Sequence, residues 1–214
     1  MPKWASGPTG HPSYWRRAKK ELSAADPVMA DIIKGCGRGG LIGQGDPFVT
    51  LVRSIVGQQI SVRAADSIWN RLEETVGGIS PKKVAVRDET ELHGAGLTRR
   101  KASYIRDMAV AFLDGGVAPS MWHEKDDEGV IAELVALRGI GRWTAEMFLI
   151  FHLLRPDILP LDDIGLIRAC ERHYAAGEAM ARGDIEQLAQ RWQPWRSVAT
   201  WHLWRSLDPT AVAY

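Results

Sequence analysis

Apolar residues recur at helical spacing through most of the chain, with polar residues at the positions between them. Apolar side chains three and four residues apart share one face of a helix, whereas strict alternation is typical of a strand. Alternation of that kind, bounded by turn residues, is almost absent. The pattern predicts an all-α protein with helices over residues 14–22, 27–35, 47–56, 61–76, 81–85, 89–94, 99–113, 127–136, 142–154, 164–175, 185–191 and 196–207.

Several predicted helices carry signals at their ends. Asp26, Asp46 and Ser80 each stand directly before a proline. Such side chains cap the free N–H groups of a helix, and proline fits the first helical position. Glycine ends helices because it accepts left-handed backbone. Glycines mark the predicted stops at Gly35, Gly77, Gly94, Gly115 and Gly177.

Two segments rich in helix breakers, residues 35–45 and 115–122, divide the chain. The helices between them predict a central helical lobe over residues 46–113. Residues 1–45 and 114–214 are expected to form a second helical lobe. No repeat of solenoid length and no low-complexity segment is present.

The composition is that of an ordinary globular protein, with 45% hydrophobic and 25% charged residues in a chain of 214. The longest apolar stretch, residues 147–154, is too short to span a bilayer. Residues 1–6 contain no apolar run typical of a secretory signal. We therefore expect an intracellular protein without a membrane partner, in the cytoplasm or, in a eukaryote, the nucleus.

Two cysteines, Cys36 and Cys170, are too few for a Cys-ligated iron–sulfur cluster, and the histidines are scattered singly. We expect no required cofactor. The net charge of +1 neither supports nor excludes a nucleic-acid partner, because a near-neutral total can hide a basic patch. Basic runs at residues 16–20 and 99–101 are candidates for such a patch, although charge runs are more often solvated faces.

Residues 137–145 have the spacing of a tight corner between two helices. The turn Gly139-Ile140-Gly141 leaves backbone N–H groups unshielded, and the helix after it presents its positive end. Thr144 and Ala145 are small enough for close packing. Such a corner can grip a DNA phosphate; the alternative is an ordinary helix corner with a glycine at the helix end.

Four separated motifs in the chain resemble those of the helix-hairpin-helix superfamily of DNA glycosylases. They are residues 55–61, 137–145, 160–166 and 192–204. The first and last are similar to the alkylpurine branch known as 3-methyladenine DNA glycosylase II, here in a short form without an N-terminal β-domain. The resemblance covers residues 48–207 and implies a two-lobed helical bundle with its active-site cleft between the lobes.

The resemblance also implies an activity. Enzymes of this branch flip an alkylated purine such as 3-methyladenine out of duplex DNA and hydrolyse its N-glycosidic bond, leaving an abasic site for base excision repair. The implied partner is double-stranded DNA with damaged bases, and we expect a monomer. Two alternatives stay open: a non-catalytic helix-hairpin-helix DNA-binding module, and a glycosylase for mismatched or oxidised bases.

The resemblance assigns the catalytic aspartate to Asp163, with Asp162 as its neighbour. An anion stabilises the oxocarbenium character that the sugar develops as the base departs. Asp163 also precedes the predicted helix 164–175, whose positive end favours a carboxylate. A plain helix cap would look the same in the sequence.

Trp143 determines the subclass that the resemblance implies. Relatives that also cleave the strand carry a lysine at this position, because an amine is needed for a Schiff base. Indole cannot form one, which predicts a monofunctional hydrolase without lyase activity. Trp143 and Trp204 are expected to line the base pocket, where aromatic faces attract a cationic alkylated base. Met147, one turn after Trp143, completes the predicted pocket; packing in the core is the alternative for the tryptophans.

The remaining assignments concern DNA and an ion. The loop around Gln58 and Gln59 is expected to fill the gap left by the flipped base, with Gln59 as the plug and Gln58 buried against backbone. Lys101 is expected either to contact a phosphate or to be solvated. The resemblance also implies a structural Na⁺ or K⁺ at the hairpin, held by the backbone carbonyls of Leu137 and Ile140.

Overall fold

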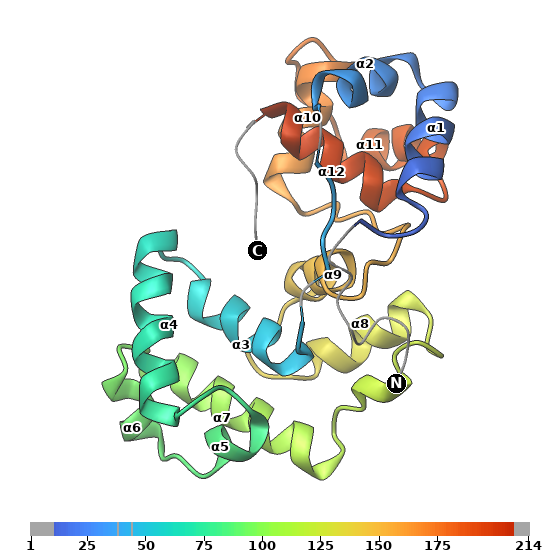
Figure 1. The fold of residues 1–214 in the computed structure, drawn as a ribbon. Helices are drawn as coiled ribbons and strands as arrows, with labels where there is room; N and C mark the ends of the chain where they lie inside the picture. The colour runs from blue at the N-terminus through green and yellow to red at the C-terminus, as the bar shows by residue number, and fades with distance from the viewer. Residues whose placement is uncertain (1–10, 38, 44, 208–214) are drawn as a thin grey trace. The chain divides into compact units, whose positions relative to one another are not determined.

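A computed structural model describes residues 11–37, 39–43 and 45–207, and every regular element in these ranges is a helix (Figure 1). No strand occurs in the described part of the chain, which confirms the all-α prediction. No helix within it is long and apolar enough to cross a membrane.

The helices follow one another through short connections. In chain order they are α1 (Trp15–Ala25), α2 (Pro27–Gly35), α3 (Pro47–Gly57), α4 (Val62–Val76), α5 (Pro81–Ala85), α6 (Glu89–Gly94), α7 (Arg99–Asp114), η1 (Pro119–Met121), α8 (Asp127–Val135), α9 (Arg142–Phe151), α10 (Ile164–Tyr174), α11 (Arg182–Ala189), η2 (Gln190–Trp192) and α12 (Arg196–Leu207). Every predicted helix is present, and the short 3-10 helices η1 and η2 are additions to the prediction.

All three helices begin at the predicted proline, and the predicted side-chain cap is present at two of the three sites. The side chain of Asp26 accepts the N–H groups of Val28 and Met29, and Asp46 accepts that of Val49. The prediction of a cap at Ser80 is wrong, because its side chain makes no cap hydrogen bond and α5 starts on its proline alone. Helix initiation therefore needs the proline more than the cap at this site.

Three helix boundaries lie three residues from their predicted positions, and the first is the end of α1, which runs to Ala25 where the prediction stopped at residue 22. The prediction that the ninth helix runs to residue 154 is wrong: α9 ends at Phe151, and Leu154 has a left-handed φ of +54°. The helix predicted over 185–191 starts earlier, at Arg182, because the carboxylate of Asp184 accepts the N–H of Ala181 and caps the first turn.

The chain divides into two compact units. We call the described residues 45–148 the hairpin unit and residues 11–43 with 149–207 the aspartate unit, and the division falls within α9. This differs from the predicted lobes, which placed residues 114–148 with the second lobe. The difference arises from the hairpin: Arg138 pairs with Asp107 of α7, and the side chain of Gln58 bonds the carbonyl of Gly139.

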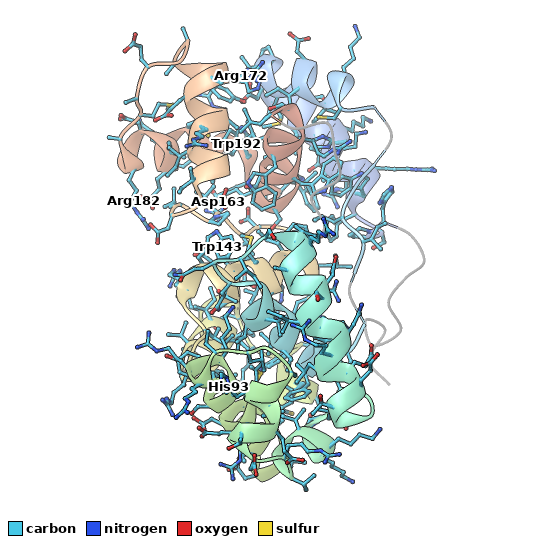
Figure 2. The ribbon with its side chains drawn as sticks, turned by 90° about the vertical axis from the view of Figure 1, so that its left-hand side faces the viewer. His93, Trp143, Asp163, Arg172, Arg182 and Trp192 are labelled. Carbon is cyan, nitrogen blue, oxygen red and sulfur yellow. The ribbon has the colours of Figure 1, made fainter. Side chains whose placement is uncertain are left out.

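Each unit has its own core. In the hairpin unit, α7 packs against α3, α5 and α6, and Trp122 meets Phe148 edge to face with centroids 5.2 Å apart. In the aspartate unit, α12 packs against α1, α2 and α10. There the fully buried Asp26 also accepts the hydroxyl of Tyr174 at 2.8 Å and the indole N–H of Trp192 at 3.0 Å (Figure 2 labels Trp192). This shared acceptor joins the start of α2 to α10 and η2.

Candidate functional site

The turn between α8 and α9 needs a glycine at one of its two glycine positions. The N–H of Ile140 donates to the carbonyl of Leu137 at 3.1 Å. Gly139 has a φ of +90°, and a Cβ there would lie 2.3 Å from Cδ2 of Tyr104. Gly141 is exposed, and a Cβ on it would meet nothing within 4 Å. Gly139 therefore permits the close packing, and Gly141 leaves the approach to the start of α9 open.

The arginines that flank the hairpin already have carboxylate partners. Arg138 contacts Asp107 at 2.6 Å. Arg142 donates to Glu128 at 3.0 Å and to Glu146 at 3.1 Å. The hydrogen bond from Arg142 lowers the pKa of the exposed Glu128 carboxyl. With the two guanidinium groups paired, the part of the hairpin suited to an anion is the backbone at the N-terminus of α9.

The loop after α3 holds its two glutamines differently. Gln58 is half-buried, and its Nε2 donates to the carbonyl of Gly139 at 3.0 Å. Gln59 is exposed and has a left-handed φ of +59°. A non-glycine residue in this region carries a backbone cost of about 1–3 kcal/mol and persists only where its surroundings impose it. The loop therefore anchors Gln58 and presents Gln59.

Lys101, in the first turn of α7, contacts this same loop. Its Nζ donates to the carbonyls of Val56 at 2.9 Å and of Gln58 at 2.8 Å. The side chain is half-buried, and desolvation lowers the pKa of the ammonium. The expectation that Lys101 is simply solvated is therefore wrong. Its contact with a phosphate stays a prediction.

Asp163 begins α10 and is buried, with 6% of its surface exposed (Figure 2). Its Oδ1 accepts the backbone N–H of Leu166 at 2.7 Å, as a helix cap does, and the indole Nε1–H of Trp204 at 2.7 Å. Both donors and the positive end of α10 face the same carboxylate. The arrangement holds this carboxylate in a fixed orientation.

A glycine makes room for this pair. A Cβ on Gly165 would lie 2.9 Å from Cδ1 of Trp204 and 3.0 Å from Oδ1 of Asp163. The indole of Trp204 also stacks on Phe151, with centroids 5.8 Å apart and planes 12° apart. Trp204 is thus fixed by a stacked ring, by a hydrogen bond and by the absence of a side chain at position 165.

The neighbouring acid is in a different environment. The carboxylate of Asp162 is exposed and forms an ion pair with Arg182 at the start of α11. An exposed and paired carboxylate cannot hold a localised anion against a reacting sugar as a buried one can. The geometry therefore distinguishes Asp163 from Asp162, as the sequence expectation did.

The remaining predicted site residues lie on α9. Thr144 and Met147 are buried, with 9% and 5% exposure, and Trp143 is half-buried. These three belong to the hairpin unit, whereas Asp163 and Trp204 belong to the aspartate unit. The base pocket predicted from Trp143, Met147 and Trp204 stays a prediction. No group of three or more His, Cys, Asp or Glu side chains suited to a metal occurs among the described residues.

Sequence reasoning did not identify three residues that shape the site: Tyr104 against Gly139, Phe151 against Trp204, and Gly165 beside Asp163. The aromatic partners leave no local signal, because their contacts are long-range. Gly165 did leave one, since a glycine in the first turn of a helix is unfavourable unless packing requires it.

An all-helical fold, a hairpin turn with glycines on both sides of Ile140 and an aspartate buried at a helix start are the features of the helix-hairpin-helix class of DNA-binding proteins. The chain belongs to the HhH-GPD superfamily of base excision DNA repair proteins, whose sequence profile matches residues 52–194. The match includes the loop around Gln58 and Gln59, the hairpin and Asp163.

Individual relatives agree with this assignment. The alkylbase DNA glycosidase-like protein mag2 of Schizosaccharomyces pombe is 29% identical, over 90% of this chain and 94% of that protein. The crystal structure of a DNA-3-methyladenine glycosidase from Bacillus halodurans is similar with a TM-score of 0.84 and 34% identity, covering 89% of each chain. A 3-methyladenine DNA glycosylase of S. pombe in complex with abasic DNA has a TM-score of 0.77 and 26% identity, covering 92% of this chain and all of that one.

Proposed function

We propose that this protein is a monofunctional DNA glycosylase that releases alkylated purines such as 3-methyladenine from duplex DNA and leaves an abasic site. The observation that carries the proposal is Asp163, a buried carboxylate oriented by two N–H donors at the start of a helix. The names of the similar proteins given above support the substrate class: an alkylbase DNA glycosidase-like protein, a DNA-3-methyladenine glycosidase and a 3-methyladenine DNA glycosylase. The proposed enzyme works as a monomer, in the compartment that holds DNA.

In the proposed reaction, the bond between C1′ of the sugar and the base nitrogen breaks, and both electrons leave with the base. An alkylated purine that carries a positive charge departs neutral, so little protonation of the base is needed. The sugar develops oxocarbenium character, which the anion of Asp163 stabilises. Water then adds its oxygen to C1′ and releases a proton.

Trp143 supports the absence of strand cleavage. Bifunctional glycosylases need an amine that attacks C1′ and forms a Schiff base. An indole has no such nucleophile, so water is the acceptor and the strand stays intact.

The hairpin and the loop around Gln58 and Gln59, which we call the plug loop, serve base flipping in this proposal. The backbone N–H groups at the start of α9, reached past the exposed Gly141, bind a phosphate of the damaged strand. Gln59 enters the space that the flipped nucleotide vacates. Its exposure and its anchored neighbour Gln58 support this choice between the two glutamines. Flipping costs a few kcal/mol, which the plug offsets.

The flipped base would stack on the indole of Trp204, which donates to Asp163. A cationic ring gains from an aromatic face, more so when both are desolvated. Stacking of this kind discriminates weakly among alkylated purines, so we expect a broad substrate range.

The hairpin carbonyls are suited to a structural Na⁺ or K⁺. The carbonyl of Gly139 already accepts a hydrogen bond from Gln58. The carbonyl of Leu137 accepts one N–H, from Ile140, and keeps a second lone pair that could bind the ion. The carbonyls of Leu137 and Ile140 would hold the ion, which would add positive charge where a phosphate binds. DNA affinity should then fall when Li⁺ replaces K⁺ at constant ionic strength, and equal affinities would refute the site.

The test uses duplex DNA with one alkylated purine and measures free base and strand breaks separately. The proposal predicts base release with strands intact until alkali is added. Strand scission without alkali would contradict the monofunctional assignment. Binding without release across several alkylated bases would indicate a non-catalytic module, and release confined to mismatched or oxidised bases would change the substrate class.

A further inference from the structure

In the first turn of α7, the ammonium group of Lys101 meets the end of another helix. Lys101 reaches from α7 to the C-terminus of α3, and the two helices pack together (Figure 1). Its Nζ donates to the carbonyls of Val56 and Gln58, which lie on either side of Gly57, the last residue of α3. Two of the three N–H groups of the ammonium therefore donate to carbonyls at the C-terminus of α3.

These carbonyls are groups that a helix leaves without intrahelical partners. The last C=O groups of a helix carry its partial negative charge, and a cation beside them is favourable. The half-buried position of Lys101 strengthens each hydrogen bond, because the ammonium is partly removed from water. Burial also lowers the pKa of this ammonium, as expected for a group placed for its contacts within the protein and not for solvent.

Gln58 is held from both sides as a result. Its carbonyl accepts from Lys101 at 2.8 Å, and its side-chain amide donates to Gly139 of the hairpin at 3.0 Å. The next residue, Gln59, is exposed and adopts the left-handed φ of +59°. A strained residue beside a doubly anchored one is the arrangement expected when the surroundings impose the conformation of a loop tip.

The same helix also supports the hairpin. Tyr104 lies against Gly139, and Asp107 pairs with Arg138. Lys101, Tyr104 and Asp107 follow at intervals of three residues, so they share one side of α7. One face of α7 therefore contacts both the plug loop and the hairpin, the two segments that contact DNA in the proposed function.

We propose that Lys101 is a positioning residue that fixes the plug loop relative to the hairpin, so that Gln59 enters the duplex while the hairpin grips the backbone. This inference rests on the proposed function. It replaces a phosphate contact with an internal one: Lys101 acts through the carbonyls of Val56 and Gln58 and does not touch DNA.

The test compares Lys101→Met, which keeps the length of the side chain without its charge, with Lys101→Arg, which keeps donors. Lys82→Met is the matched control, because Lys82 is an exposed lysine of the same unit, on α5. Three quantities are measured on duplex DNA: the single-turnover rate of base release, fluorescence of 2-aminopurine beside the lesion as a report of flipping, and the dependence of affinity for an abasic-site duplex on salt concentration.

For Lys101→Met we expect a loss of about tenfold or more in the single-turnover rate, since two charge-assisted hydrogen bonds are removed. The flipping signal should fall in parallel. The slope of log Kd against log salt should equal that of the unaltered protein, because no phosphate contact is lost. Lys101→Arg should recover most of the rate, and Lys82→Met should retain it.

A change of about 0.9 in the salt slope for Lys101→Met would overturn the inference and identify a phosphate ligand. An unchanged rate and flipping signal would overturn it as well. If Lys101→Met does not fold, Lys101→Gln replaces it, because its shorter amide cannot reach both carbonyls, and the same outcomes decide. Absence of base release by the unaltered protein would refute the proposed function instead, which keeps the two failures distinct.

Discussion

Replacing Gly165 by alanine changes the immediate surroundings of the catalytic candidate by a single methyl group. The new Cβ would lie 2.9 Å from Cδ1 and 3.1 Å from Nε1 of Trp204, and 3.0 Å from Oδ1 of Asp163. Ordinary contacts of a Cβ begin at about 3.4 Å. The indole of Trp204 and the carboxylate of Asp163 must therefore shift by up to about half an ångström. These two groups are joined by a hydrogen bond, so the shift disturbs that bond.

The expected effect on the rate is larger than the effect on the fold. Alanine is favoured over glycine in a helix by up to about 1 kcal/mol, whereas overpacking costs about 1–3 kcal/mol. The free energy of unfolding should thus change by no more than about 2 kcal/mol. Catalytic groups tolerate about 0.5 Å of displacement, and a 1 Å error can cost about a hundredfold. We expect a loss of about tenfold in base release, or ~1.4 kcal/mol in activation free energy.

The assay is single-turnover release of an alkylated purine from a duplex, with affinity for an abasic-site duplex and thermal unfolding measured in parallel. Gly183→Ala is the matched control. Gly183 is the second residue of α11, as Gly165 is of α10, and a Cβ on it would meet nothing within 4 Å. The control should keep its rate within about twofold of the unaltered protein, because a surface methyl group changes little.

Full activity of Gly165→Ala would refute the reasoning, because it would mean that the position of Asp163 and Trp204 does not limit the reaction. Equal losses in Gly165→Ala and Gly183→Ala would also refute it, since the effect would then come from the helices in general. If the activity falls only in proportion to the amount of folded protein, the methyl group affects stability alone.

Two further predictions concern stability. His202 is fully buried, and neither of its ring nitrogens has a hydrogen-bond partner among the described residues. Burial lowers the pKa of this imidazole from 6.5 to about 3, with a smaller contribution from the charge of Lys19. The unfolded chain therefore binds a proton that the folded chain does not, and stability falls as the pH drops from about 6.5 towards 3, with about 2 kcal/mol lost at pH 5. Urea unfolding of His202→Phe at pH 7 and pH 5 should show a smaller difference than the unaltered protein, and equal differences would contradict the assignment. Gly139→Ala should lower the free energy of unfolding by about 2–5 kcal/mol, because alanine is strained in left-handed backbone and its Cβ clashes with Tyr104. Gly141→Ala should change it by less than about 0.5 kcal/mol. Equal shifts in the thermal unfolding of the two variants would contradict the different roles given to the two glycines.

The sequence was sufficient for the helices and for the position of Asp163 at a helix start, because both depend on local signals. Helical periodicity and the prolines after Asp26 and Asp46 determine where helices begin. Asp163 combines a cap position with a recognisable motif, and the structure places it at the start of α10. Local chemistry of this kind is visible in the chain without knowledge of its packing.

The division of the chain and the environment of Lys101 were not predictable in the same way. The hairpin joins the unit of α7 through Tyr104 and Asp107, more than thirty residues away in sequence, and no local pattern encodes such pairs. For Lys101 the sequence predicts either a phosphate contact or a solvated side chain. Its partners are backbone carbonyls, which every residue has, so the sequence carries no trace of the contact.

The central claim is that Asp163 supplies the anion that stabilises the departing sugar. The most direct measurement is the single-turnover rate of 3-methyladenine release from duplex DNA by the unaltered protein and by Asp163→Asn, which keeps the size of the side chain and an oxygen that can still accept from Leu166 and Trp204. The account predicts a loss of about a hundredfold or more, with binding to an abasic-site duplex retained. Release by Asp163→Asn at the unaltered rate would contradict the claim and leave Asp163 as a helix cap alone.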